Sequence, residues 1–222
     1  MTSRLNIMRC YMPAQTHRLI ALLEDAARGT FPPADGLVEV LPAPPGPAMA
    51  VIGFTSHHVM ATAAPDVWVR EQLPDGDLLA PMSPRFLTAL AERLGMRDDG
   101  LDVLLAAEGM PGTSALSEAS HNAHPRVARA SAHRNDIRVF EDADRTALLI
   151  LGYGLAGRLE VACEVEESQR NQGLATRALI EARHLVTPGQ ILFAQTAPGN
   201  SASLRSLLSA GFHPIGSEVL FF

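Results

Sequence analysis

A polar segment in the last third of the chain combines residue types that bind anions. Residues 165–176 read Val-Glu-Glu-Ser-Gln-Arg-Asn-Gln-Gly-Leu-Ala-Thr and lie between a strand-like and a helix-like run. The first N–H groups of a helix have no partner within the helix, and the helix dipole places partial positive charge there. Gly173 and the small Ala175 let a ligand approach this backbone, while Arg170 and the Thr176 hydroxyl add a cation and a donor. The segment therefore predicts a site for phosphate groups, and a pyrophosphate suits it best.

The hydrophobic pattern around this segment predicts the elements that position it. Apolar and β-branched runs predict strands over residues 136–141, 147–154, 159–165, 191–196 and 215–221. Helical spacing of apolar residues predicts helices over residues 174–186 and 201–210. This order of elements predicts an α/β protein with a mixed sheet and helices packed on it.

The first half of the chain predicts elements of its own. Periodicity and breakers predict helices over residues 16–28, 65–73 and 83–94, the first capped by Thr16, and strands over residues 37–41, 48–63 and 101–107. Residues 109–133 are rich in Gly, Pro, Ser and His and read as a linker that could include a short helix. The predicted organisation is an N-terminal α/β accessory region (1–109), a linker (110–132) and a second domain (133–222).

Two motifs occur in order in the second domain. The first is Val-x-x-x-x-Arg-x-x-Gly-x-Ala over residues 165–175, and the second is Asn200-x-x-Ser203 followed by Leu207-Leu208-x-x-Gly211-Phe212. Together with the helix and strand between them, they resemble the GNAT superfamily of N-acetyltransferases. In that family the first motif is the acetyl-CoA pyrophosphate loop and the second lies beside the pantetheine arm. The resemblance covers the chain from residue 136 onward and implies the GNAT acyltransferase fold, with acetyl-CoA as cofactor; the accessory region could be a degenerate copy of the same fold.

The resemblance also implies how the cofactor is held. In the family, the strand before the loop splays away from its neighbour, and its main-chain groups pair with pantetheine. By position these strands are residues 159–165 and 191–196, and a backbone N–H near the splay would polarise the thioester carbonyl. The cofactor-binding residues expected on this basis are Cys163, Val165, Arg170, Asn171, Gln172, Gly173, Leu174, Ala175, Thr176, Asn200 and Ser203.

The chain departs from the family at two catalytic positions. Leu207 stands where many members carry a tyrosine as general acid, and Gln195 stands where others carry a glutamate. Direct attack by an amine still needs a group that accepts its proton. Glu160 and Glu164, on the strand beside the splay, are candidates for this catalytic role, and solvent-exposed strand carboxylates would explain them equally well. Tyr153, in a glycine-rich turn over residues 152–157, is a further candidate for the acid.

Composition restricts the class of partner. The formal net charge of −6 disfavours contact with a phosphate backbone, so no nucleic-acid partner is expected. All 18 basic residues are Arg, which excludes chemistry through a lysine. No apolar run reaches the length of a membrane span, residues 1–13 lack a signal-peptide core, and Cys10 and Cys163 lie far apart. We therefore expect a cytoplasmic protein without a membrane partner.

The histidines do not form a metal-binding pattern. His57 and His58 are neighbours in an expected strand, where adjacent side chains point to opposite faces. We therefore expect one packed and one exposed ring, which do not share a metal. His121, His124 and His133 fit a solvated linker, so no metal is expected.

The sequence thus predicts an acetyl-CoA-dependent N-acetyltransferase that acts by direct transfer on a small amine, an amino acid derivative or a peptide amine. Two alternatives remain: an acyl-CoA-binding regulatory module without turnover, and an acyltransferase that uses a longer acyl-CoA. The apolar chain end, residues 219–222, is expected to be buried, either in the chain's own sheet or against a second subunit in a homodimer.

Overall fold

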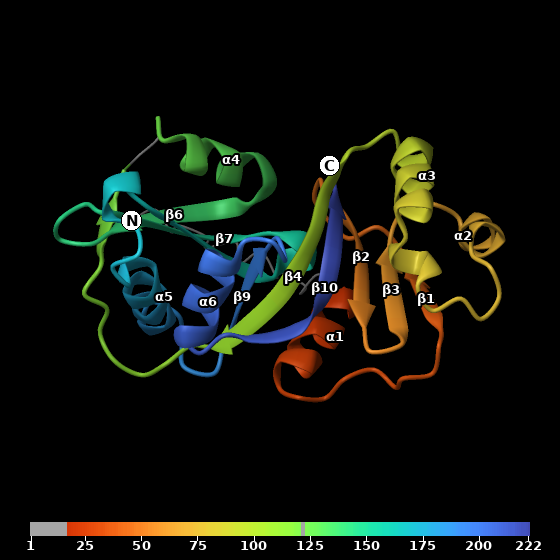
Figure 1. The fold of residues 1–222 in the computed structure, drawn as a ribbon, viewed down its shortest axis with the longest axis horizontal. Coiled ribbons are helices and arrows are strands. Elements are labelled where there is room, and N and C mark those ends of the chain that lie inside the picture. Colours follow the sequence, from red (N-terminus) through yellow and green to blue (C-terminus); the bar gives the residue numbers. More distant parts are fainter. Residues whose placement is uncertain (1–16, 121–122) are drawn as a thin grey trace, which may run out of the picture.

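The strands of the chain form one long twisted sheet (Figure 1). The computed structural model describes residues 17–120 and 123–222. Within them, ten strands pair in the order β1-β3-β2-β10-β4-β9-β8-β7-β6-β5. These strands are β1 (Val38–Leu41), β2 (Met49–Phe54), β3 (His57–Ala61), β4 (Asp98–Glu108), β5 (Ser117–Ala119), β6 (Asn135–Glu141), β7 (Ala147–Tyr153), β8 (Leu159–Val165), β9 (Ile191–Thr196) and β10 (His213–Phe221).

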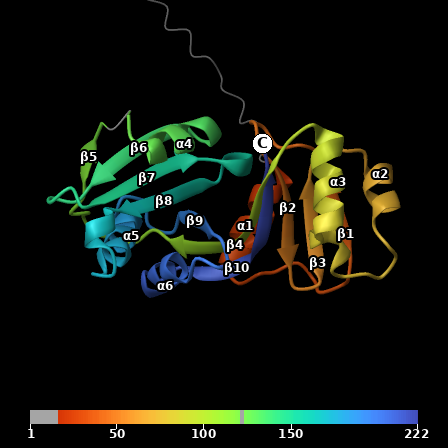
Figure 2. The ribbon, with the colours of Figure 1, turned by 45° about the horizontal axis from the view of Figure 1, so that its top comes forward.

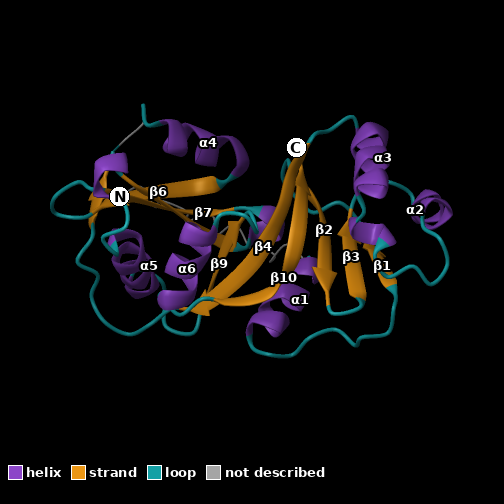
Figure 3. Ribbon diagram, viewed as in Figure 1, coloured by secondary structure: helices purple, strands orange, loops and turns teal. Residues whose placement is uncertain are grey.

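Helices cover both faces of this sheet (Figures 1, 2 and 3). They are α1 (Arg18–Ala27), α2 (Asp66–Gln72), α3 (Pro84–Leu94), α4 (Pro125–His133), α5 (Leu174–His184) and α6 (Ser201–Ser209), with short 3-10 turns η1 (Ala80–Met82), η2 (Leu155–Gly157) and η3 (Glu167–Gln169). Successive strand residues point to opposite faces, so on β4 Leu104 packs with α1 whereas Leu105 packs with α5 and α6. The same alternation places α1 and α4 on one face and α2, α3, α5 and α6 on the other. The predicted class, a mixed α/β sheet flanked by helices, is confirmed.

Strand β4 joins the two parts of the chain. It pairs antiparallel with β9 on one side and with β10 on the other. Strands from residues 1–109 and from residues 133–222 therefore belong to one continuous sheet, while the division into an accessory region and a second domain stays a prediction. The stretch expected to be a linker contains β5 and most of α4. The helix α4 is amphipathic, and its Val127 and Ala130 are buried against β6 and β7.

Two further expectations concern the terminal strand and the paired histidines. Residues 219–221 of β10 are buried in the chain's own sheet, as one of the two alternatives predicted. A homodimer stays a prediction. The expectation of one exposed histidine is wrong, because His57 and His58 are 6% and 7% exposed. Both rings are buried because β3 lies between β1 and β2, and His57 Nδ1 lies 2.9 Å from Asp35 Oδ1. The predicted Thr16 cap lies outside the described residues; among the described ones, the His17 side chain accepts from the N–H of Leu19 at the start of α1.

None of the helices in the described part of the chain combines the length and apolarity that crossing a bilayer requires.

A buried ion-pair network ties β8, β10 and α4 together. Arg158, which is 1% exposed, donates to Glu218 through Nη1 and Nη2 at 2.6 and 2.8 Å and to Glu160 through Nε at 2.6 Å. The second oxygen of Glu160 accepts from Arg134 Nε at 2.7 Å. Each charge compensates another, so removal of one member would leave a buried charge without a partner.

We therefore expect Arg158→Met to reduce the free energy of unfolding by about 3–5 kcal/mol, because two carboxylates lose their shared cation. Urea unfolding of the variant and the wild type measures this difference. Arg70→Met, which removes an exposed pair with Asp66, serves as the control and should change stability little. Equal stabilities of the two variants would contradict the role given to Arg158.

Candidate functional site

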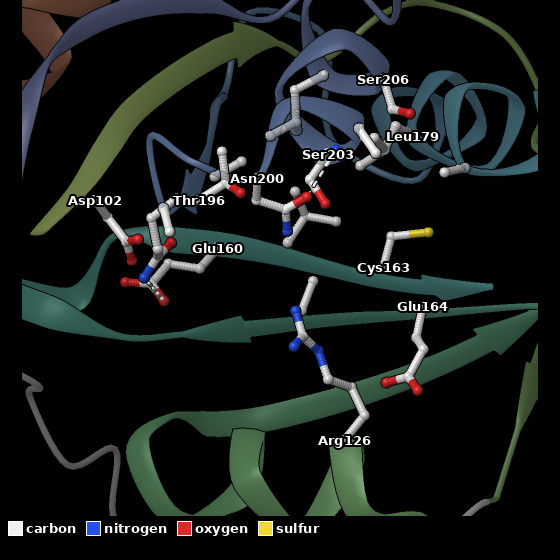
Figure 4. Close-up of a pocket in the computed structure, with 18 of the residues that line it drawn as sticks. Asp102, Arg126, Glu160, Cys163, Glu164, Leu179, Thr196, Asn200, Ser203 and Ser206 are labelled. Carbon is white, nitrogen blue, oxygen red and sulfur yellow. Dashed lines mark hydrogen bonds between the residues drawn. The ribbon is translucent and has the colours of Figure 1, made fainter. Parts of the chain in front are cut away.

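A cavity of about 1060 Å³ runs between α4, α5 and α6 and is lined along one side by β8. Its walls include residues from both faces of the sheet, such as Ala130 of α4 on one face and Leu179 of α5 on the other. Figure 4 shows the helices α5 and α6 on one side of β8 and α4 on the other. A cavity of this kind can pass through a sheet only where two strands separate.

Strands β8 and β9 separate in this way. They pair in parallel at a single position, Glu160 opposite Phe193, whereas β8 pairs with β7 along its whole length. Beyond that position the main-chain groups of β8 that face β9 have no strand partner. Cys163 and Val165 lie on this free part of β8 and line the cavity. The splay expected between residues 159–165 and 191–196 is therefore present in the fold.

The start of α5 opens onto the same cavity. Gly173 precedes the helix with a φ of 76°, a left-handed conformation that favours glycine, and no described side chain caps the first turn. A Cβ built on Gly173 would have no protein atom within 4 Å, so the space beside it is open. Asn171 also has a positive φ, of 64°. The uncapped N–H groups of this turn can therefore contact an anion directly.

Most of the expected cofactor-binding residues meet at this cavity. Ten of the eleven line it; Gln172 is not among the lining residues and donates to Gln169 Oε1 at 3.2 Å. Arg170 is exposed, and its Nε donates to the main-chain oxygen of Val165 at 3.3 Å. That contact leaves the rest of its guanidinium group available to a ligand at the start of α5.

Helix α6 contributes the opposite wall. Asn200 caps it, with Oδ1 accepting from the N–H of Ser203 at 3.2 Å, and both side chains line the cavity (Figure 4). The cap leaves the amide nitrogen of Asn200 free to donate. Leu207, where many family members carry a tyrosine, is buried and lines the cavity, so it contributes an apolar surface without a proton. Tyr153 is not among the lining residues.

Glu160, one of the two expected catalytic carboxylates, is at the position where β8 and β9 separate. It is 3% exposed, and its oxygens accept from Arg158 and Arg134 and from Gln195 Nε2 at 3.4 Å. Burial alone would raise its pKa, but the two arginines outweigh this effect and hold the pKa below its usual value. Gly154 makes room for the carboxylate, since a Cβ there would lie 2.3 Å from Glu160 Oε1. Glu160 is therefore an ionised structural group that accepts a proton poorly.

Glu164 and Cys163 lie farther along β8, and Glu164 faces Arg126 of α4 (Figure 4). Burial lowers the pKa of the Arg126 guanidinium, although Glu164 opposes this effect. Burial also raises the pKa of the Cys163 thiol to about 12, so this cysteine stays a neutral thiol at physiological pH.

Asp102 is a lining residue that the sequence patterns did not single out. It lies on β4 directly opposite Glu218 of β10, at the end of the cavity near Glu160 and Thr196 (Figure 4). Burial, together with the charges of Glu218 and Asp99, raises the pKa of its carboxyl group to about 6. An acidic residue within the otherwise apolar run of residues 101–107 was the available signal, but nothing in the sequence placed β4 beside the splay.

No group of three or more His, Cys, Asp or Glu in residues 17–120 and 123–222 has an arrangement that could hold a metal ion.

Comparison with known proteins finds similarity in structure alone. No protein-family model and no curated protein sequence matches the chain. Similar solved structures include an acetyltransferase from the GNAT family of Colwellia psychrerythraea, with 15% identity and a TM-score of 0.40 over 62% of each chain. They also include a GCN5-related N-acetyltransferase from Kribbella flavida, with 17% identity and a TM-score of 0.39 over 61% of this chain and 62% of that one. The match thus spans less than two thirds of either protein.

The raised pKa of Asp102 predicts a pH-dependent stability. The unfolded chain releases this proton near its ordinary pKa of 3.8, whereas the folded chain holds it until about pH 6. Stability therefore falls as the pH rises from about 4 to 6, and the loss persists above that range. We expect Asp102→Asn to raise the melting temperature at pH 8 and to have little effect at pH 4. Thermal unfolding across this range measures the difference, and a less stable variant at pH 8 would contradict the assigned environment.

Proposed function

We propose that this chain is an N-acyltransferase of the GNAT type, which uses acetyl-CoA and transfers the acetyl group directly to an amine. The observation that carries the proposal is the continuity of one cavity from the uncapped start of α5 to the splay between β8 and β9. The anion site at the start of α5 and the unpaired main-chain groups of β8 thereby lie one after the other along the cavity. A pyrophosphate followed by an amide-containing arm matches both in chemistry.

The residues present fit such a donor in three places. The N–H groups after Gly173, with Arg170 beside them, would hold the pyrophosphate. The free edge of β8 near Cys163 and Val165 would pair with the amides of the pantetheine arm, as a further strand would. Asn200 and Ser203 would line the opposite wall. When bound, acetyl-CoA supplies an activated acyl group as a thioester.

The acceptor side of the proposal is an amine that enters from the α4 face. Arg126, Ala130 and His133 of α4 line the cavity there, together with Asp102 and Phe222. A small amine, an amino acid derivative or a peptide amine would reach the thioester from this side. The absence of a tyrosine at Leu207 leaves the departing sulfur to be protonated by the amine itself or by water. A cytoplasmic setting, expected from the cysteine usage, belongs to the same proposal.

An acyl-CoA-binding module without turnover is the second candidate. The observation in its favour is that Leu207 and Gln195 line the cavity where catalytic side chains often stand. It shares the donor site with the first candidate but predicts no transfer.

Binding measurements test the donor site. Gly173→Leu should weaken acetyl-CoA binding at least about tenfold, because the side chain would fill the space open to the pyrophosphate. Its effect on S-acetylpantetheine, which lacks the pyrophosphate, should be small. Gly189→Leu is the matched control, since Gly189 has a φ of 80°, equally open surroundings and a place outside the cavity. Unchanged acetyl-CoA affinity of Gly173→Leu would refute the phosphate site.

Release of free thiol from acetyl-CoA, measured with a panel of primary amines, tests the transfer step. We expect amine-dependent thiol release together with formation of the acetylated amine. Tight binding of acetyl-CoA without thiol release for any amine would refute the transferase and support the binding module.

A further inference from the structure

We propose that Asp102 is the residue that binds the acceptor as an ammonium ion and then takes its proton, so that the acceptor is a cationic amine. This inference rests on the proposed transfer function and names the substrate class and a catalytic residue for it. It is carried by the placement of Asp102 in the cavity and by the charges around it.

The position of Asp102 suits this role. Its strand, β4, lies next to β9, and β9 separates from β8 directly beyond Glu160 and Phe193. Asp102 lines the cavity on the α4 side, and Figure 4 shows its carboxyl group at the same end as Glu160 and Thr196. An acceptor that enters from α4 would therefore meet Asp102 beside the splay.

The charges at this end of the cavity leave Asp102 without a counter-ion. Glu160 and Glu218 are compensated by Arg158 and Arg134. Asp99 forms an ion pair with Arg129 at 2.8 Å. Among residues 17–120 and 123–222, Asp102 has neither a hydrogen-bond nor an ion-pair partner, although it is partly buried beside Glu218. An ammonium group bound there would supply the missing positive charge.

Polar atoms in the same cavity indicate that its occupant is polar. Gln195 Oε1, Arg134 Nη1 and His133 Nδ1 are buried and have no hydrogen-bond partner among the described residues, and all three residues line the same cavity. Buried polar atoms are nearly always hydrogen-bonded, so a hydrogen-bonding ligand or ordered water belongs beside them. Gln195 Oε1 can accept a second N–H from the same ammonium group.

Groups on every neighbouring element set the proton affinity of Asp102. Glu218 of β10 and Asp99 of β4 raise the pKa of its carboxyl group, in addition to burial, whereas Arg129 of α4 and Arg158 lower it. The resulting pKa of about 6 leaves the Asp102 carboxyl group largely ionised at pH 7. Because this pKa is close to the working pH, the group can exchange protons readily. Burial lowers the pKa of His133, which lines the same cavity, so this imidazole adds no positive charge to it at neutral pH.

The proposed step balances as follows. The ammonium group transfers one proton to the Asp102 carboxylate and becomes a neutral amine with a free electron pair. The nitrogen forms a bond to the acyl carbon, and the bond from that carbon to sulfur breaks. The second proton lost by nitrogen goes to the sulfur, and Asp102 later releases its proton to solvent. Amide, free thiol and one proton result.

Asp102→Asn in the full chain tests the inference, with Asp98→Asn as the matched control. Asp98 is exposed on the same strand and does not line the cavity. We expect Asp102→Asn to lower kcat/KM for the amine by about 100-fold at pH 7, the scale of a lost general base, with unchanged acetyl-CoA affinity. In the wild type kcat/KM should fall below about pH 6, and this limb should be absent from the variant. Calorimetry should show that the variant binds the amine more weakly in the presence of CoA.

The outcomes separate the inference from the function on which it rests. Turnover of Asp102→Asn within threefold of the wild type, or unchanged amine affinity, would overturn the role of Asp102 and leave the transferase standing. A second outcome is that the wild type binds the amine without releasing thiol, whereas Asp102→Asn does not bind the amine. This outcome would refute the transferase while supporting Asp102 as the ammonium site. Equal losses in Asp98→Asn and Asp102→Asn would overturn the inference by showing a general effect on β4.

Discussion

The shared guanidinium group of Arg158 is the interaction on which the centre of this fold depends. Arg158 is only 1% exposed and lies between β8 and β10. It binds two carboxylates whose burial would otherwise be unfavourable. Because Arg134, the residue directly after α4, binds the other oxygen of Glu160, the network also fixes the end of this helix beside the cavity. Glu160 thereby serves to place strands rather than to exchange protons.

The second constraint is the separation of β8 and β9. A break inside a sheet would normally leave main-chain groups without partners, at a considerable cost in free energy. Here the break is flanked by the uncapped start of α5, so two sets of unsatisfied N–H groups face one cavity. Both features are unfavourable in an empty protein and favourable with a ligand of the right chemistry, which is a common property of binding sites.

Local patterns allowed much of this to be predicted from the sequence. The start of α5 was recognisable because Gly173, Ala175 and the helix after them lie within a few residues. The strands and helices after residue 136 followed from hydrophobic periodicity for the same reason. Features that depend on distant residues were missed. The partners of Arg158 include Glu218, 60 residues away, and Asp102 meets the cavity only because β4 pairs with β9. Helix α4 was expected only as a short helix that the linker could include, because its buried side consists of Val127 and Ala130 alone.

The insertion of β4 between β9 and β10 has a consequence for the biogenesis of the protein. Residue 103 pairs with residue 196, so the strand made early must wait for most of the chain to be synthesised before its partners exist. Until then the apolar run of β4, residues 103–107, has two open edges, the kind of surface that chaperones bind and that associates between chains. A gene fragment that begins after residue 110 would likewise lack the strand that fills the middle of its sheet. Both halves of this polypeptide are therefore needed to complete the sheet.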